Sequence, residues 1–166
     1  CHLYTSNDRA SISRTMNIEQ SRHNMIEQQI RTWQVLDPLV LDTLSVVKRE
    51  HFVPAQYPTL AFVDTEIPLT ESAAMLSPKV EARILQAAEV KPEDTILEIG
   101  TGSGYMTALL AHLGQQVTTV EIDPALAKSA ETKLAENHIH NTEVILGDGS
   151  HGYTTETVKA YDVIII

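Results

Sequence analysis

The chain has 166 residues, of which 43% are hydrophobic and 20% charged, so it is long enough for one globular domain with a sizeable core. Its formal net charge of −10 argues against recognition of nucleic acid through phosphates, and no apolar run approaches the roughly 20 residues that cross a bilayer; we expect neither nucleic acid nor a membrane as partner. A single cysteine, Cys1, excludes an internal disulfide framework and favours a reducing, cytoplasmic location.

The N-terminal half carries helical signals and no glycine. Residues 1–16 are polar and aperiodic, which predicts a disordered or non-native leader. Apolar residues at near-helical spacing predict a helix over 18–33, and the pair Asp37-Pro38 is typical of the start of a second helix. Three prolines then break the chain into short extended pieces, and Pro78 opens a third helix.

The second half alternates strands and helices. A β-type run over 95–99 leads into a glycine-rich turn and a helix, and further apolar runs over 117–120, 143–146 and 161–166 predict three more strands. This alternation predicts an α/β fold with a doubly wound, mostly parallel sheet behind an N-terminal helical extension.

The predicted elements divide the chain into parts. After the leader, we assign 17–78 to an N-terminal helical segment and 79–166 to the α/β domain. The final apolar run stops inside a buried type of strand, so we expect a fragment that ends after its fourth strand and lacks the C-terminal part.

The glycine-rich turn is the strongest functional signal. Gly100, Gly102 and Gly104 alternate directly after a strand and before a helix, an arrangement that brings backbone N–H groups close to an anionic ligand group. Glu121 ends the next strand, where a carboxylate can accept both hydroxyls of a ribose. The spacing differs from that of dinucleotide enzymes and resembles the first motif of S-adenosylmethionine-dependent methyltransferases. A β–α turn without a ligand and a nicotinamide site are the alternatives.

Several stretches resemble one family, the protein-L-isoaspartate O-methyltransferases. The resemblance covers roughly residues 17–166 and implies the Rossmann-like fold of class I S-adenosylmethionine methyltransferases. Its most particular stretch is Arg49-Glu50-His51-Phe52-Val53-Pro54; others are Gln28-Gln29-Ile30-Arg31, Ala61-Phe62-Val63-Asp64, Val80-Glu81-Ala82-Arg83 and Gly147-Asp148-Gly149.

The resemblance implies repair of damaged proteins by methylation of the free carboxylate of L-isoaspartyl residues, with S-adenosyl-L-methionine as cofactor. It places Asp64 and the 68–77 loop on the substrate side, with Ser77 as the candidate catalytic contact near the transferred methyl. Glu98 would orient the cofactor's amino group, Ile122 would pack on adenine and Asp148 would accept from the adenine amino group. The full set of implied cofactor-binding residues is Glu98, Gly100, Thr101, Gly102, Gly104, Glu121, Ile122, Asp148 and Gly149. Isoaspartyl proteins are the implied partners, and a monomer is expected.

One segment departs from the family pattern. Between Pro68 and Pro78 the family has a glycine-containing loop that ends in Thr-Ile-Ser, whereas here Leu76 stands in the place of the serine and Ser77 follows one position later. Either Ser77 substitutes through a shifted loop or the acceptor differs. A methyltransferase with another substrate, or a cofactor-binding module without catalysis, are therefore the alternatives.

Some of these charged residues can have a purely structural role instead. Asp148 can be a turn residue, Asp64 a cap, and Arg49-Glu50 an ordinary surface ion pair. The histidines lack the spacing of a zinc site, so no metal is expected.

Overall fold

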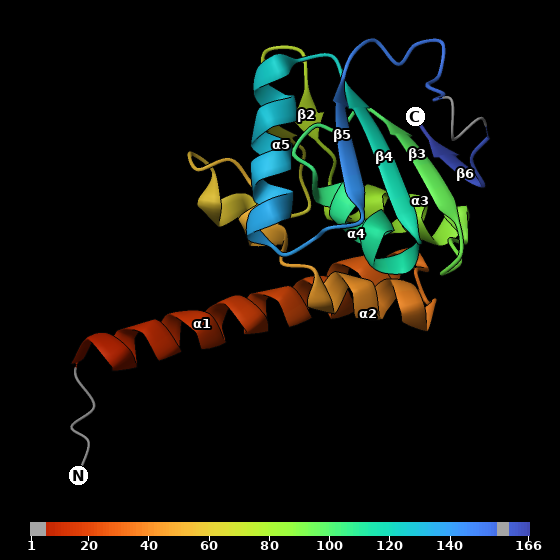
Figure 1. Cartoon of the computed structure of the whole chain (residues 1–166). Helices are drawn as coiled ribbons and strands as arrows, with labels where there is room; N and C mark the ends of the chain where they lie inside the picture. Colours follow the sequence, from red (N-terminus) through yellow and green to blue (C-terminus); the bar gives the residue numbers. More distant parts are fainter. Residues whose placement is uncertain (1–5, 156–159) are drawn as a thin grey trace.

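The computed structural model describes residues 6–155 and 160–166 (Figure 1). Its α-helices are α1 (Ser6–Met25), α2 (Pro38–Val46), α3 (Pro78–Ala88), α4 (Tyr105–Leu113) and α5 (Pro124–Glu136). Its strands are β1 (Ile67–Pro68), β2 (Ala74–Met75), β3 (Thr95–Ile99), β4 (Gln116–Glu121), β5 (Thr142–Leu146) and β6 (Val163–Ile165). Shorter helical turns are η1 (Ile26–Ile30), η2 (Arg31–Trp33), η3 (Arg49–His51) and η4 (Pro58–Leu60).

The first helix is longer than its sequence pattern predicts. It begins at Ser6, so the structure has residues 6–16 in a helix where the sequence pattern predicts a disordered or non-native leader; residues 1–5 lie outside the described residues. Residues 10–17 are exposed, and this part of α1 extends away from the rest of the chain (Figure 1). A solvated helix needs no apolar stripe, which is why hydrophobic periodicity could not reveal it. The predicted 18–33 helix continues through the η1 and η2 turns to Trp33.

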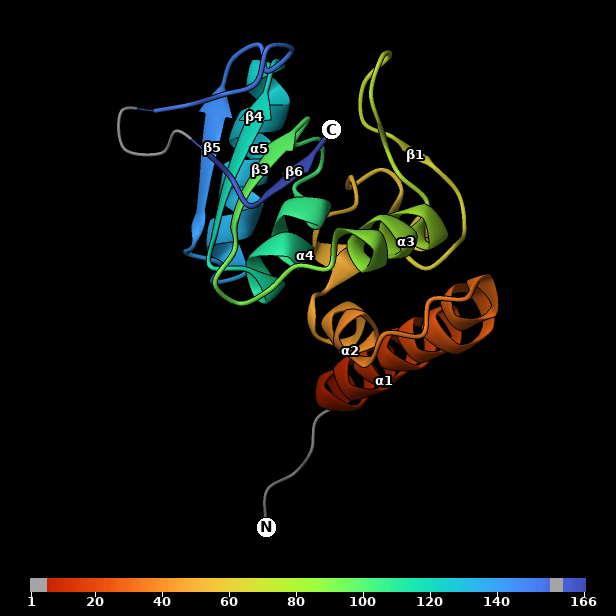
Figure 2. The same ribbon diagram turned by 90° about the vertical axis from the view of Figure 1, so that its right-hand side faces the viewer.

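Local signals fix the starts of the next helices as predicted. Asp37 caps α2: its Oδ1 accepts a hydrogen bond from the Leu39 N–H at 2.9 Å, and Pro38 occupies the first helical position. Pro78 likewise occupies the first turn of α3, although the Ser77 side chain before it makes no capping hydrogen bond. Figures 1 and 2 show α1 and α2 beneath the end of the sheet at which its strands begin.

Four strands form the parallel sheet that the alternating pattern predicts. Their spatial order is β5-β4-β3-β6, and every neighbouring pair is parallel. The chain thus starts the sheet with β3, adds β4 and β5 on one side and returns to add β6 on the other. In such a sheet the loops diverge at the carboxyl ends of the first strand and its late neighbour, here β3 and β6, and leave a crevice for a ligand.

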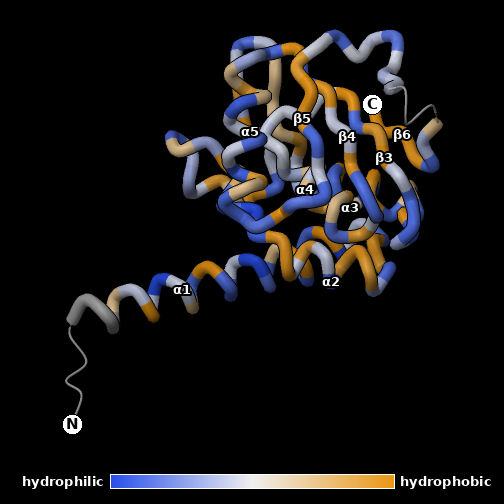
Figure 3. Tube along the Cα trace, in the orientation of Figure 1, coloured by the Kyte–Doolittle hydropathy of each residue, from blue (hydrophilic) through white to orange (hydrophobic). Residues whose placement is uncertain are grey.

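One hydrophobic core lies between the sheet and the helices. Ile96 of β3 and Val117 of β4 are fully buried in it together with Leu109 of α4, and hydrophobic residues mark α2 and β6 as well as parts of the other strands in Figure 3. Residues on both sides of the predicted 78/79 boundary contribute, from Met25 to Leu134. The two segments therefore form one folded unit.

On the other face of the sheet, the loop after β5 packs against the strands. Leu97 and Val120 are buried there without belonging to that core cluster. Gly149 lies against this face: a Cβ built on it would come within 2.8 Å of the Ile99 side chain and 3.4 Å of that of Val120. The loop after β5 is thereby held close to β3. Within the described ranges, no helix has both the length and the apolar character needed to span a membrane.

Candidate active site

The glycine-rich loop lies at the carboxyl end of β3. Gly100, Gly102 and Gly104 have φ angles of 92°, 55° and 85°, a left-handed conformation that side chains disfavour. A Cβ at Gly100 would meet nothing within 4 Å, whereas one at Gly104 would come within 3.2 Å of Ala130 Cβ. Gly104 is thus required by backbone conformation and helix packing, and Gly100 borders open space at the strand edge.

Glu121 connects this loop to the next helix. One carboxylate oxygen accepts from the Gly102 N–H at 2.9 Å, and the other accepts from the Asp123 N–H at 2.9 Å. Asp123 in turn caps α5 through bonds from the Ala125 and Leu126 N–H groups. The carboxylate at the end of β4 is therefore fixed against the glycine loop.

Glu98 is a buried carboxylate at the end of β3. It accepts hydrogen bonds from the hydroxyls of Thr107 and Thr119, the latter at 2.7 Å, and the Thr119 hydroxyl is paired with that of Thr101 at 2.6 Å. Burial raises the pKa of Glu98 to about 7, against the effect of the two hydroxyls, and the nearby Glu121 raises it further.

A pocket joins the glycine loop to the N-terminal segment. Glu81 of α3 and Glu98 of β3 both line it, and the end of β6 forms part of its wall. Its lining residues are Ala74, Met75, Leu76, Glu81, Ile84, Glu98, Ile99, Gly100, Thr101, Gly102, Ser103, Met106, Ile165 and Ile166. The crevice at the β3–β6 switch point is therefore walled by the segment that departs from the family pattern.

The two predicted catalytic residues lie around this pocket without lining it. Leu76 lines the pocket and is 39% exposed, whereas Ser77 stands at the N-cap of α3, where its side chain makes no capping hydrogen bond. Asp64 forms an ion pair with Lys79 at 2.8 Å and so connects the turn before β1 to the start of α3.

The outer predicted cofactor residues are exposed. The Ile122 side chain is 70% exposed, next to Glu121. Asp148 accepts a hydrogen bond from the Ser150 N–H at 2.9 Å, which lowers the pKa of this exposed carboxyl, so the residue does make a turn. Gly149 packs closely against the side chains of Ile99 and Val120. Both the turn role and the adenine role of Asp148 are compatible with this position.

The reading of Arg49-Glu50 as a surface ion pair is wrong. Arg49 is 1% exposed and pairs with Glu81, with 2.5 Å between Nη1 and Oε2, while Glu50 pairs with Arg22 at 2.6 Å. Burial raises the pKa of the Glu81 carboxyl, and the Arg49 guanidinium acts to lower it. The helical spacing of α3 could have indicated this pair. Glu81 lies four residues before Leu85 and therefore on the same buried face of the helix, and a buried carboxylate requires a partner.

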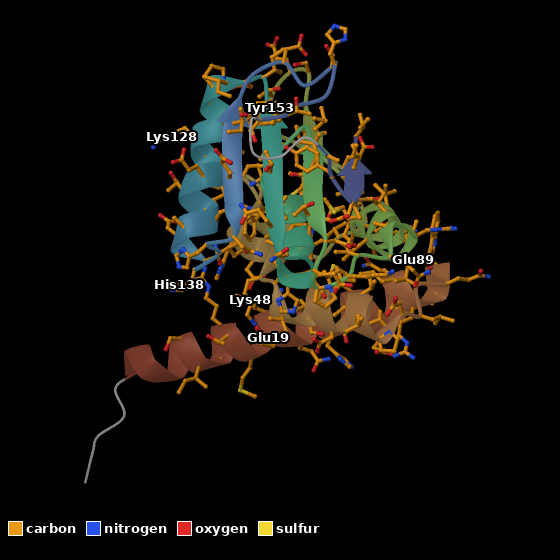
Figure 4. The ribbon with its side chains drawn as sticks, turned by 45° about the vertical axis from the view of Figure 1, so that its right-hand side comes forward. Glu19, Lys48, Glu89, Lys128, His138 and Tyr153 are labelled. Carbon is orange, nitrogen blue, oxygen red and sulfur yellow. The ribbon has the colours of Figure 1, made fainter. Side chains whose placement is uncertain are left out.

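Arg22 belongs to a second cluster at the base of the molecule. Its guanidinium also bonds Glu19, which accepts from Lys48 Nζ at 2.7 Å. Figure 4 shows Glu19 and Lys48 facing one another from α1 and the segment after α2. These contacts lower the pKa of Glu19 to about 2. Within the described residues, no three His, Cys, Asp or Glu side chains are grouped so as to hold a metal ion.

Comparisons with known proteins show the family of this chain. Residues 20–166 match the family model described as protein-L-isoaspartate(D-aspartate) O-methyltransferase. Among curated relatives, the protein-L-isoaspartate O-methyltransferase of Protochlamydia amoebophila is 39% identical over 142 residues, which are 86% of this chain and 67% of that protein. That of Koribacter versatilis is 38% identical over 145 residues, 87% of this chain and 64% of the relative. The chain thus spans about two thirds of the length of these relatives.

Solved structures show the same fold. A protein-L-isoaspartate O-methyltransferase superposes with a TM-score of 0.73 at 22% identity, over 89% of this chain and 47% of that one. A Plasmodium falciparum protein of that type, in complex with S-adenosyl-L-homocysteine, superposes with a TM-score of 0.64 at 18% identity, over 88% and 71%. At these identities the superpositions support the fold alone. On the match over residues 20–166 and the identity to curated relatives, the chain belongs to the protein-L-isoaspartate(D-aspartate) O-methyltransferase family.

Proposed function

We propose that this chain carries the cofactor site and part of the acceptor site of an S-adenosyl-L-methionine-dependent carboxyl methyltransferase that acts on L-isoaspartyl residues of damaged proteins. The observation that carries the proposal is the pocket in which the glycine loop meets Leu76 and its neighbours. A methyl donor held by the loop would face Leu76 and its neighbours, which line the same pocket. Family membership supports the choice of acceptor.

The residues of the loop fit the cofactor. Open space above Gly100 leaves room for a ligand against the backbone, and the Glu98 and Glu121 carboxyl groups lie at the ends of β3 and β4 beside it. Glu98 would hold the amino group of the methionine portion, and Glu121 the ribose hydroxyls. Ile122 and Asp148 would flank the adenine. When bound, the cofactor supplies a methyl group already activated on a sulfonium centre.

The chain's own residues then have to orient the acceptor and exclude water. A carboxylate has a pKa of about 4 and is ionised at neutral pH, so no general base is required. Orientation of the two reactants therefore dominates the rate. The Ser77 hydroxyl, which makes no capping bond with α3, would contact the acceptor, and Asp64 would fix the adjoining turn through Lys79.

One observation favours a second candidate. Leu76 presents an apolar side chain to the pocket at the place of the family's serine. This apolar side chain would fit a methyltransferase that uses the same cofactor but methylates a less polar acceptor.

Transfer of labelled methyl to matched peptides tests the proposal. The full-length protein is given S-adenosyl-L-methionine with labelled methyl and either an isoaspartyl peptide or the same peptide with normal aspartate. We expect label only in the isoaspartyl peptide. Cofactor binding without transfer to either peptide would contradict the isoaspartyl assignment and favour the second candidate. A cytoplasmic location and a monomeric state stay predictions.

A further inference from the structure

Arg49 is the buried cation next to the acceptor side of the pocket. It lies in the η3 turn, is 1% exposed, and its guanidinium stacks over the Tyr105 ring at 4.9 Å. One end of the guanidinium, Nη1, bonds Glu81 at 2.5 Å. The other end, Nη2, donates to the carbonyl of Leu76 at 3.0 Å. A single planar group thus connects the wall of the cofactor pocket to the segment that enters it.

The bond to Leu76 fixes a peptide unit rather than a side chain. The described backbone contains no cis peptide bond, so the N–H of Ser77 points opposite to the Leu76 carbonyl. Holding that carbonyl toward Arg49 therefore turns the Ser77 N–H to the other side of the segment. It also sets where the Leu76 side chain enters the pocket and where Ser77 begins α3.

Other restraints on this segment are few and lie further back. The hairpin of β1 and β2 pairs two residues on each side, and Leu69 N–H donates to the Ala73 carbonyl at 2.9 Å. These bonds hold the segment as far as Met75. Arg49 holds the next residue, at the point where the segment meets the pocket.

We propose that Arg49 is a positioning residue for methyl transfer: through the Leu76 carbonyl it sets the place of the Leu76–Ser77 peptide unit opposite the methyl donor. This inference rests on the proposed function of the site. In this role Arg49 acts through Leu76, since Arg49 itself is not among the residues that line the pocket. Glu81 compensates its buried charge, so removing Arg49 alone would leave an uncompensated carboxylate.

The test is a comparison of paired variants in the full-length protein. R49M/E81Q removes both charged partners, so that no unpaired charge is buried, and it is compared with the wild type, because E81Q alone would leave Arg49 buried without its carboxylate. We expect kcat/KM for the isoaspartyl peptide to fall by about 10- to 100-fold between the two, because small displacements of reacting groups have effects of that size. Affinity for S-adenosyl-L-homocysteine should stay the same between them.

Arg22 supplies a matched control. It is 2% exposed, pairs with Glu50 at 2.6 Å and stacks over Phe62 at 5.2 Å, yet it has no bond to the 69–77 segment. R22M should lower the melting temperature and leave kcat/KM unchanged when assayed well below that temperature. An equal loss of kcat/KM in R22M would overturn the positioning role, since any buried arginine would then have the same effect.

Amide hydrogen exchange gives a readout that does not depend on the reaction. Exchange in peptides covering residues 69–77 should be faster in R49M/E81Q than in the wild type, and unchanged in R22M. Unchanged exchange together with unchanged kcat/KM would overturn the inference. If the wild-type protein transfers no methyl group, the proposed function fails, and the exchange comparison still decides whether Arg49 fixes this segment.

Discussion

Glu121 accepts a hydrogen bond from the Gly102 N–H at 2.9 Å, so the carboxylate that ends β4 holds the loop that follows β3. Its second oxygen is bonded by the Asp123 N–H at the start of α5. The expected ribose ligand is therefore also a structural support of the glycine loop. A ribose would have to share these oxygens with the backbone donors, which a carboxylate can do because it has about four acceptor positions.

Replacing Glu121 by glutamine should weaken cofactor binding. The amide keeps one acceptor oxygen but turns N–H groups toward a backbone donor, so hydrogen bonds worth about 1.5–3 kcal/mol are lost and the Kd should rise by about 10- to 100-fold. Calorimetric titration with S-adenosyl-L-homocysteine measures the change. Glu136→Gln, at an exposed position of α5, is the control. An E121Q protein that binds as tightly as the control would remove Glu121 from the cofactor site.

Alanine at Gly100 should affect ligand binding more than packing. Its φ of 92° costs an alanine about 1–2 kcal/mol of stability, but no atom lies within 4 Å of the added Cβ. If the open space is where the cofactor approaches the backbone, G100A should abolish binding at cofactor concentrations that saturate the wild type. G147A places a methyl group in open space at an ordinary φ and should bind normally. Retained affinity in G100A would mean that the cofactor lies elsewhere.

Glu98 should make stability depend on pH. Burial raises its pKa from 4.5 to about 7, so between these values the folded state holds a proton that the unfolded state has lost. Stability from this group is therefore present at low pH and is lost as pH rises from about 4.5 through 7, by at most about 1.4 kcal/mol per pH unit. Denaturant unfolding of wild type and E98Q at pH 5, 6, 7 and 8 measures the difference. Parallel pH profiles for the two proteins would contradict the raised pKa.

Ser77 should contribute to transfer and not to cofactor binding. Loss of a hydroxyl donor to a charged acceptor costs about 1.5–3 kcal/mol, so Ser77→Ala should lower kcat/KM by about 10- to 100-fold at unchanged affinity for S-adenosyl-L-homocysteine. Ser72→Ala, at an exposed position of the same segment, is the control. Equal rates for the two variants would exclude Ser77 as a catalytic contact.

The N-terminal helix should be dispensable up to the ion pairs at its end. Residues 10–17 are exposed, whereas Glu19 and Arg22 bond Lys48 and Glu50. Removal of residues 1–17 should leave stability within about 0.5 kcal/mol, while removal of residues 1–22 should cost at least about 1 kcal/mol more because Glu50 loses its partner. Denaturant unfolding of the two shortened proteins checks this. A large loss in the first would show that the exposed part of α1 makes stabilising contacts.

The sequence by itself determined the elements that depend on neighbours along the chain. Asp37-Pro38 starts α2, Pro78 starts α3, and the alternating apolar runs form the parallel sheet, because caps, prolines and periodicity act over a few residues. The glycine loop and Glu121 lie together because the carboxyl ends of neighbouring parallel strands share one edge.

Contacts between distant residues were decided only by the tertiary structure. Arg49 pairs with Glu81, 32 positions away, rather than with its neighbour Glu50, because folding buries both and a buried charge requires a buried partner. That Leu76 lines the pocket while Ser77 stands at the N-cap position of α3 depends on the same packing. The start of α1 had no sequence signal either, since an exposed helix has no apolar face to reveal it. The sequence therefore specified the edge of the sheet at which the glycine loop lies, and three-dimensional packing specified which residues face that edge.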